Sequence, residues 1–361
     1  MSTEQSPVPT WPRNAWYVAC MPDEIAGKPL GRQICGERIV FFRGPDGKVA
    51  ALDDFCPHRG APLSLGTVRD GVLVCGYHGL AMGCQGTTVS MPGQRVGGFP
   101  PIRTFPTIER YGFIWVWPGD VEQADTAKLH HLEWAESEYW AYGGGLYHVD
   151  CDYRLMIDNL MDLTHETYVH ASSIGQKEID EAPVRTRVEG EEIVTSRFMD
   201  GIMPPPFWQM ALRGAGLPDD VLVDRWQVCR FSLPSHVLIE VGVALAGNDG
   251  YDADNSVKAS SIVVDFITPE TETSHWYFWG MARRFAADDR ALTDTIRQGQ
   301  GAIFGEDMEI LQRQQQNLDR YPGRKLLLLN IDAGGARART MISRAIAAER
   351  PVTEQLQATV A

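Results

Sequence analysis

Two short motifs that combine cysteine and histidine constrain this chain more than any other feature of its sequence. The first is Cys56-Pro57-His58 and the second is Cys75-Gly76-Tyr77-His78. Each offers one thiolate and one imidazole, side chains that bind soft and borderline metals. Two loops that close on a shared metal group need tight turns, which glycine and proline permit. The segment has them at Gly60, Pro62, Gly66, Gly76 and Gly79. The pattern predicts a small metal-binding β domain.

The number and spread of the cysteines indicate that those in the two motifs bind a metal rather than form disulfide bonds. The chain has seven cysteines, an odd and scattered set, and Cys84 fits no ligand spacing, so we predict a small core residue there. The first residues lack the basic start and apolar core of a secretory signal, and no uncharged apolar run could span a membrane. We therefore expect a reduced, cytoplasmic protein.

The formal charge of -14 argues against nucleic acid or an anionic membrane as partner.

Two kinds of metal group could use these four ligands. A structural zinc is one alternative, but zinc modules usually pair like ligands with like. The alternation of cysteine and histidine in both motifs suits a two-iron, two-sulfur cluster, with Cys56 and Cys75 on one iron and His58 and His78 on the other. Histidine in place of cysteine is the Rieske arrangement and raises the reduction potential. A visible spectrum separates the alternatives, since a zinc protein is colourless.

A second polar group lies in the segment from Tyr153 to His170, which has a helical pattern. Asn159, Asp162 and His165 recur every three residues and so share one side of a helix, beside apolar neighbours. This predicts a polar site set into a core. His165 and His170 are five residues apart, so on a regular helix they point about 140° from one another. Both can reach one ion only if the helix ends or bulges between them.

Two histidines and a carboxylate form the triad that holds Fe(II) in non-haem oxygenases. The longest helical pattern, 289–318, offers three candidates for this carboxylate, Glu306, Asp307 and Glu309. Asp307 lies on the apolar stripe of that helix, Glu306 at its edge and Glu309 on the opposite side. Because a buried carboxylate must be paired or bind a metal, we predict Asp307 as the third ligand. This second site argues against an electron-transfer Rieske protein with an appended binding domain, and an iron count would separate the two.

The pattern of strands and helices predicts two domains. We expect a [2Fe-2S] domain over 1–118, made of short strands and turns, and a connector over 119–145 that ends in three flexible glycines. Over 146–361 we expect a catalytic domain with the mononuclear iron. Its strands between 183 and 285 precede the long helix, which predicts an α+β fold with that helix packed on an antiparallel sheet.

Four segments, NAWYVA, CPHRGAPLSLG, CGYHGL and DNLMDLTH, resemble the Rieske non-haem iron aromatic oxygenases, and in particular their O-demethylase branch. The resemblance extends from Asn14 to about Gln316. It implies an all-β Rieske domain followed by an α+β helix-grip catalytic domain. It implies the same iron ligands, with His165 and His170 from an Asp-x-x-His-x₄-His segment and Asp307 from a Glu-Asp pair. Asp162 matches the family's bridging aspartate, which connects the iron to a cluster histidine of the neighbouring subunit.

The resemblance also implies an activity and partners. It implies the terminal oxygenase component of a system that uses O2 to O-demethylate a methoxylated aromatic acid. The substrate expected first is vanillate, which would give protocatechuate and formaldehyde. Such a reaction belongs to aromatic compound catabolism, including lignin degradation. The alternative substrate is another methoxybenzoate or the methyl group of an arylsulfonate. No Gly-x-Gly-x-x-Gly follows a strand, so we expect NAD(P)H to act through a separate reductase. The resemblance implies that this reductase carries flavin and an iron–sulfur centre. Electron transfer between subunits implies a homotrimer.

The substrate contacts are the least determined part of the site. An aromatic acid needs a cation or several donors for its carboxylate. Arg225, Arg230 and Arg283 lie on or beside predicted strands and are candidates, with surface exposure as the alternative for each. Asn159 is a candidate supporting residue beside the iron. The aromatic run Trp276-Tyr277-Phe278-Trp279 is predicted to be core.

Overall fold

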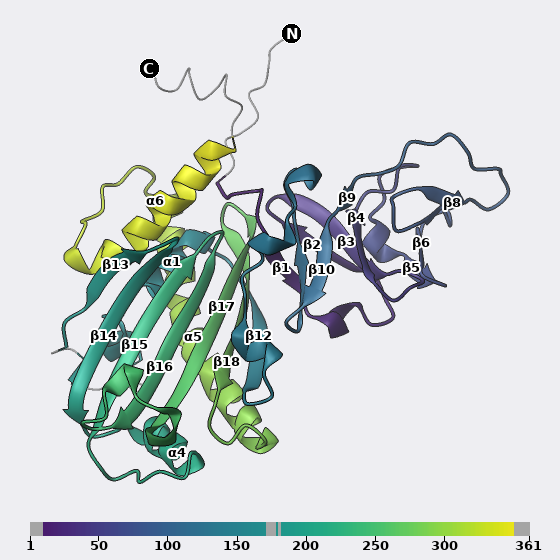
Figure 1. Ribbon diagram of the computed structural model, residues 1–361. Helices are drawn as coiled ribbons and strands as arrows, with labels where there is room; N and C mark the ends of the chain where they lie inside the picture. Colours follow the sequence, from purple (N-terminus) through teal and green to yellow (C-terminus); the bar gives the residue numbers. More distant parts are fainter. Residues whose placement is uncertain (1–9, 171–177, 180–181, 350–361) are drawn as a thin grey trace. The chain divides into compact units, whose positions relative to one another are not determined.

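The computed structural model describes residues 10–170, 178–179 and 182–349, and Figure 1 shows the arrangement of their helices and strands. The chain divides into two compact units. Among the described residues, unit 1 comprises 10–131 together with 268–271 and 344–349, and unit 2 comprises 132–170, 178–179, 182–267 and 272–343. The first break, between His131 and Leu132, falls inside the range expected for the connector.

Unit 1 is built from short strands, as the sequence predicts. Its strands are β1 (Tyr17–Cys20), β2 (Leu30–Ile34), β3 (Glu37–Arg43), β4 (Val49–Asp53), β5 (Thr67–Arg69), β6 (Val72–Val74), β7 (Ala81–Met82), β8 (Thr88–Ser90), β9 (Thr104–Phe105), β10 (Thr107–Arg110) and β11 (Phe113–Val116). They form three sheets, with the strand orders β1-β11-β10, β2-β3-β4-β9 and β5-β6-β7-β8. The cysteines of both metal motifs and Leu63 belong to one apolar core, against which Cys84 packs as the sequence predicts.

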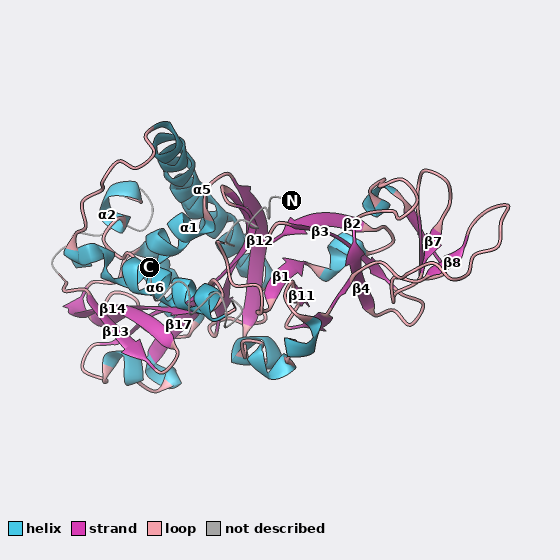
Figure 2. Cartoon of the chain, turned by 90° about the horizontal axis from the view of Figure 1, so that it is seen from above, coloured by secondary structure: helices cyan, strands magenta, loops and turns pink. Residues whose placement is uncertain are grey.

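Unit 2 is an antiparallel sheet with helices on one side. Its strands are β12 (Ala141–Val149), β13 (Arg185–Glu189), β14 (Glu192–Ile202), β15 (Val223–Ser232), β16 (His236–Leu245), β17 (Lys258–Thr271), of which 268–271 belong to unit 1, and β18 (Ser274–Arg283). The order in the sheet is β12-β18-β17-β16-β15-β14-β13. The α-helices with described bounds are α1 (Tyr153–Leu160), α2 (Glu166–Val169), α4 (Pro206–Gly214), α5 (Arg290–Arg320) and α6 (Ala333–Ala348), of which 344–348 belong to unit 1. Figure 2 shows α1, α2 and α5 on the same side of this sheet.

The long helix α5 confirms the helix expected over 289–318. Asp289 caps its start by accepting a hydrogen bond from the Leu292 amide at 2.9 Å, which satisfies one of the free donors of the first turn. The helix packs on β12 and β18, where the Tyr147 hydroxyl donates to the Gly301 carbonyl at 3.0 Å. The predicted α+β catalytic fold is therefore confirmed.

Two local expectations differ from the structure. The three glycines Gly143–Gly145 form part of strand β12 and pair with β18. A Cβ atom on Gly145 would lie 2.5 Å from the Trp279 ring, and one on Gly144 would lie 2.3 Å from the Tyr142 hydroxyl, so glycine here makes room for aromatic rings. The second difference is helix α4, which interrupts the run of strands and begins with Pro206 in its first turn.

Candidate metal centres

The two Cys-His motifs form loops with the same backbone hydrogen bonds. In the first, the Cys56 amide donates to the Ala61 carbonyl at 2.9 Å and the Gly60 amide donates to Cys56 at 2.8 Å. In the second, the Cys75 amide donates to Leu80 at 2.8 Å and the Gly79 amide donates to Cys75 at 3.0 Å. Gly60 and Gly79 both have a positive φ, 70° and 76°, which favours glycine. The loops therefore present their ligands in equivalent ways.

The side chains of these loops separate by ligand type. Cys56 and Cys75 are buried, whereas His58 and His78 are exposed, with ring centroids 4.6 Å apart. Burial and the neighbouring Cys75 thiol raise the pKa of Cys56. Two thiols side by side inside the domain and two imidazoles side by side at its surface fit a cluster with one iron on each pair. The donor set of the structure is thus the one that a Rieske cluster requires.

The second centre brings together His165, His170 and Asp307. One donor atom from each lies within 4.8 Å of the other two. His165 Nε2 is 3.5 Å and His170 Nε2 is 3.2 Å from the same Asp307 Oδ1 atom. The expected helix break explains how both imidazoles reach this point, because α1 ends at Leu160 and α2 runs only from Glu166 to Val169. Two imidazoles and one carboxylate are the donor set of non-haem Fe(II).

The carboxylates of α5 are arranged as the apolar stripe predicts. Asp307 is 3% exposed. Glu306 lies at the edge, and its Oε2 atom is 2.6 Å from His170 Nδ1. Glu309 points away and pairs with Arg313 on the helix surface at 3.0 Å. This contact of Glu306 was not predicted from the sequence, although its position beside a buried carboxylate is a signal for it.

Two further residues hold the triad in place. The Asn159 amide donates to Asp307 Oδ1 at 3.0 Å and so orients this carboxylate. Asp162 Oδ1 accepts hydrogen bonds from the Thr164 amide and hydroxyl, both at 2.7 Å, while Oδ2 lies 3.8 Å from His165 Nδ1. Burial raises the pKa of Asp162, but the His165 imidazole and the Thr164 hydrogen bonds outweigh it and lower that pKa below its usual value. Asp162 is therefore a fixed carboxylate that faces a ligand imidazole.

A cavity of about 370 Å³ adjoins the triad within unit 2, a size suited to a small organic ligand. Its apolar walls come from the sheet, α4 and α5, and include Trp208, Ile239, Val241, Val263, Ile303 and Phe304. Among the polar residues that line the cavity are Glu166, Arg225 and Gln227, and Gln227 donates a hydrogen bond to Glu166. Burial lowers the pKa of Arg225, and the nearby Glu166 carboxylate opposes this shift. Glu166 and Gln227 were not singled out from the sequence.

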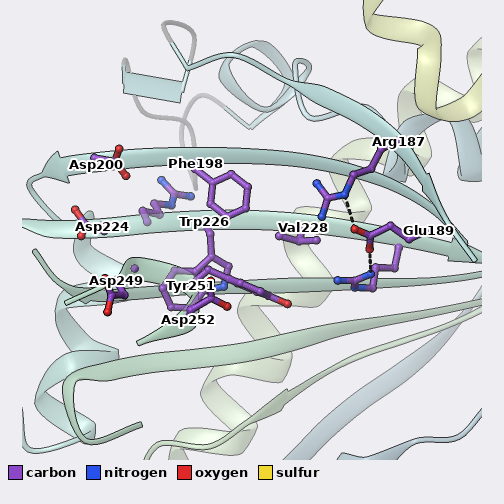
Figure 3. A pocket seen from close by; sticks show the side chains of 13 residues that line it. Arg187, Glu189, Phe198, Asp200, Asp224, Trp226, Val228, Asp249, Tyr251 and Asp252 are labelled. Atoms are coloured by element: carbon purple, nitrogen blue, oxygen red, sulfur yellow. Dashed lines mark hydrogen bonds and ion pairs between the residues drawn. The ribbon is translucent and has the colours of Figure 1, made fainter. Parts of the chain in front are cut away.

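The three candidate arginines lie in different surroundings. Arg225 is 5% exposed and lines the cavity beside the triad. Arg230 pairs with Glu189, Glu192 and Glu240, and borders a different cavity, of about 700 Å³. Figure 3 shows that cavity with Arg187, Glu189 and Trp226, and Arg225 borders it too. The Arg283 guanidinium donates to the Asp289 carbonyl at 2.7 Å and the Thr293 hydroxyl at 2.8 Å, so it holds the start of α5. Of the three, the structure places only Arg225 at the triad cavity.

The aromatic run of β18 is mostly interior, as the sequence predicts. Tyr277, Phe278 and Trp279 are buried. Tyr277 and Trp279 also meet Phe304 of α5, with ring centroids 5.2 Å and 5.7 Å apart. Such edge-to-face contacts stabilise the packing of the long helix on the sheet. Within the described residues, every helix is too short or too polar to cross a bilayer.

Comparisons with known proteins agree with both centres. Residues 15–106 match the Rieske [2Fe-2S] domain, and residues 149–348 match the vanillate O-demethylase oxygenase C-terminal domain. The chain is 71% identical to the vanillate O-demethylase oxygenase subunit of Pseudomonas sp. strain HR199, over 95% of this chain and 97% of that one. It is 31% identical to the iron-sulfur subunit of the toluene-4-sulfonate monooxygenase system of Comamonas testosteroni, over 93% and 97% of the chains.

Solved structures extend the comparison. Dicamba monooxygenase, in a crystal structure with non-haem iron and dicamba, superimposes with a TM-score of 0.79 at 33% identity, covering 97% of this chain and 99% of that one. A Rieske domain joined to a helix-covered sheet with a His-His-Asp cluster defines a Rieske non-haem iron oxygenase, an enzyme with a [2Fe-2S] cluster and a mononuclear iron. Within that class, the chain belongs to the vanillate O-demethylase oxygenase family.

Proposed function

We propose that this protein is the terminal oxygenase of a system that O-demethylates vanillate to protocatechuate and formaldehyde. The observation that carries the proposal is the 71% identity to a vanillate O-demethylase oxygenase subunit over 95% of the chain. The cavity beside the triad supports it, because it combines apolar walls for an aromatic ring with a buried arginine for a carboxylate. Such a reaction would place the protein in aromatic compound catabolism, including lignin degradation.

The proposal assigns roles to the residues of both centres. Cys56, His58, Cys75 and His78 would hold the cluster, and His165, His170 and Asp307 would hold the mononuclear iron. When bound, these groups supply single electrons and activate O2 for hydroxylation of the ether methyl group, after which the hemiacetal collapses to a phenol and formaldehyde. Asn159 would orient Asp307, and Arg225 would bind the substrate carboxylate. The division into 1–118, 119–145 and 146–361 as cluster domain, connector and catalytic domain remains part of this proposal.

The proposal includes the partners and the location of the protein. Electrons from NADH or NADPH would arrive through a separate reductase with flavin and an iron–sulfur centre. A homotrimer would let Asp162 link the iron to a cluster histidine of the neighbouring subunit. We place the protein in the cytoplasm, which agrees with its seven free cysteines.

A panel of aromatic acids tests the substrate. The purified oxygenase, supplied with a reductase and NADH, should release formaldehyde from vanillate faster than from other methoxybenzoates. An arylsulfonate with a methyl group belongs in the panel, because a 31% identical relative is named for toluene-4-sulfonate. Faster turnover of the arylsulfonate than of vanillate would replace the proposed substrate.

A further inference from the structure

Glu166 is a buried charged residue that has no role in holding iron. It is the first residue of α2, directly after the ligand His165, and only 6% of its surface is exposed. Its side chain lines the cavity beside the triad. A carboxylate in such a position must be matched by hydrogen-bond donors, since burial without them is costly.

The protein supplies a donor to one oxygen of this carboxylate. Glu166 Oε1 accepts a hydrogen bond from Gln227 Nε2 on β15 at 2.7 Å. Gln227 is held in turn by Arg197, whose Nη1 atom donates to Gln227 Oε1 at 3.3 Å. Arg197 also donates to the Leu163 carbonyl, just before α2. This chain of hydrogen bonds fixes the orientation of the Glu166 carboxylate.

The second oxygen of Glu166 differs from the first. Over residues 10–170, 178–179 and 182–349, no group donates a hydrogen bond to Glu166 Oε2, although this atom is buried. An unpaired acceptor on a side chain that lines the cavity is suited to a hydroxyl donor from a ligand. A site with such an acceptor also discriminates against a ligand that lacks the hydroxyl, because the buried oxygen then stays unpaired.

The position of Glu166 indicates which hydroxyl it would meet. Because the reacting methoxy group must lie at the triad, a substituent ortho to it lies close to the residue that follows His165. Vanillate carries its hydroxyl at that ring position and its carboxylate para to the hydroxyl, and Arg225 lines the same cavity. We infer that Glu166 Oε2 accepts the hydrogen bond of the hydroxyl ortho to the methoxy group and thereby selects 4-hydroxy-3-methoxybenzoate. This inference rests on the proposed function.

Binding of two acids tests the assignment without turnover. Vanillate and 3-methoxybenzoate, which differ only in the hydroxyl, are titrated calorimetrically into the anaerobic holoenzyme. The wild type should bind vanillate about ten- to a hundredfold more tightly, as expected for a hydrogen bond to a charged group. In Glu166→Gln, the amide oxygen takes the Gln227 donor and the NH2 group replaces Oε2. The variant should therefore lose most of its affinity for vanillate and little for 3-methoxybenzoate.

Glu309→Gln is the matched control, because it makes the same chemical change on an exposed residue of α5, and it should leave both affinities unchanged. Iron content and the visible spectrum report whether each variant keeps its metals. Equal affinities of the wild type for the two acids would mean that water rather than substrate donates to Oε2, and would overturn the assignment. An equal loss of both affinities in Glu166→Gln would also overturn it. If the wild type bound neither acid and released no formaldehyde from vanillate, the proposed function itself would be rejected.

Discussion

His170 Nδ1 and Glu306 Oε2 lie 2.6 Å apart, although the two residues are 136 positions apart in the chain. The other ring nitrogen of His170 faces Asp307 Oδ1 at 3.2 Å. Since a carboxylate accepts a hydrogen bond, Glu306 favours a proton on Nδ1 of His170, which would leave Nε2 available for the proposed iron. Two adjacent residues of α5 therefore act on the same histidine from opposite sides.

The first prediction concerns Glu306. Glu306→Ala should weaken iron binding about ten- to a hundredfold, because the ligand imidazole loses the partner that orients it. Glu306→Gln should keep most of the affinity, since its amide oxygen still accepts from Nδ1. Iron titration of the apoprotein measures both, with the exposed Glu309→Ala as control. Equal loss in the alanine and glutamine variants would show that the negative charge, and not the orientation of the ring, matters.

The second prediction concerns the triad. Asp307→Ala or His165→Ala should abolish formaldehyde release, because each removes one of three ligands from the mononuclear site. The visible spectrum of the cluster should survive, since its ligands lie in a different unit. Iron analysis should give fewer iron atoms per chain than in the wild type. Activity retained in Asp307→Ala but lost in Glu306→Ala would exchange the roles of these two carboxylates.

Sequence spacing was sufficient to predict the residues that meet in the triad. The interval of five between His165 and His170 required a helix break, and the stripe of α5 separated Asp307 from Glu306 and Glu309. Both patterns depend only on residues close together in the sequence, so they can be recognised without knowledge of the tertiary contacts. The separation of two buried thiols from two exposed imidazoles agrees with the pairing of donors that the Cys-His motifs predict.

The polar side chains that line the cavity beside the triad were not predictable from the sequence, because their contacts depend on the packing of distant strands and helices. Gln227 meets Glu166 across 61 positions, and no periodicity in either segment indicates the contact. The three arginine candidates looked alike in sequence, yet tertiary contacts give each a different role. The glycines of β12 resembled a linker because nothing nearby in the sequence shows that Trp279 packs on them.

The third prediction concerns the cluster. His78→Cys should keep a two-iron cluster and lower its reduction potential by roughly a few hundred millivolts, the difference between Rieske and all-cysteine centres. The added thiolate brings negative charge and so stabilises the oxidised state. A redox titration followed in the visible region gives the potential. An intact cluster with an unchanged potential would remove His78 from the set of ligands.

The fourth prediction concerns pH and stability. Burial raises the pKa of Asp265 on β17 to about 8, although the Tyr277 hydroxyl donates to it at 2.6 Å and opposes the shift. The folded state therefore holds a proton that the unfolded state releases between about pH 4 and pH 8. Since the unfolded state binds fewer protons there, stability falls as pH rises through this window and levels off above it. Asp265→Asn should remove this dependence.

The measurement is the melting temperature of the wild type relative to Asp265→Asn at several pH values. The free energy of unfolding of the wild type should fall relative to that of the variant between pH 5.5 and pH 8. The fall should be on the order of several kcal/mol if the full pKa shift of Asp265 contributes. The difference isolates Asp265, because other groups titrate alike in both proteins. Parallel profiles would show that Asp265 ionises normally in the folded protein.

The last prediction concerns Asp162, whose Oδ1 atom is fixed by Thr164 and whose Oδ2 atom faces His165. In the proposed trimer, this carboxylate also meets His58 or His78 of the next subunit. Asp162→Asn keeps the shape of the side chain but removes the charge that orients both rings. The variant should hold both metals and form the same oligomer, yet its reduced cluster should transfer an electron to the iron at least about tenfold more slowly. Stopped-flow reoxidation of the cluster by O2, with vanillate bound, measures this rate.

Mixed oligomers separate transfer between subunits from transfer within one chain. Cys56→Ser removes a cluster ligand and His165→Ala removes an iron ligand, so each protein alone should be inactive. In a mixed trimer, an intact cluster of one chain would face the intact iron of another, and some formaldehyde release should return. If transfer ran within one chain, no subunit of the mixture would have both centres and the mixture would stay inactive. Verified mixed trimers without activity would therefore reject the route between subunits, and the role of Asp162 in it.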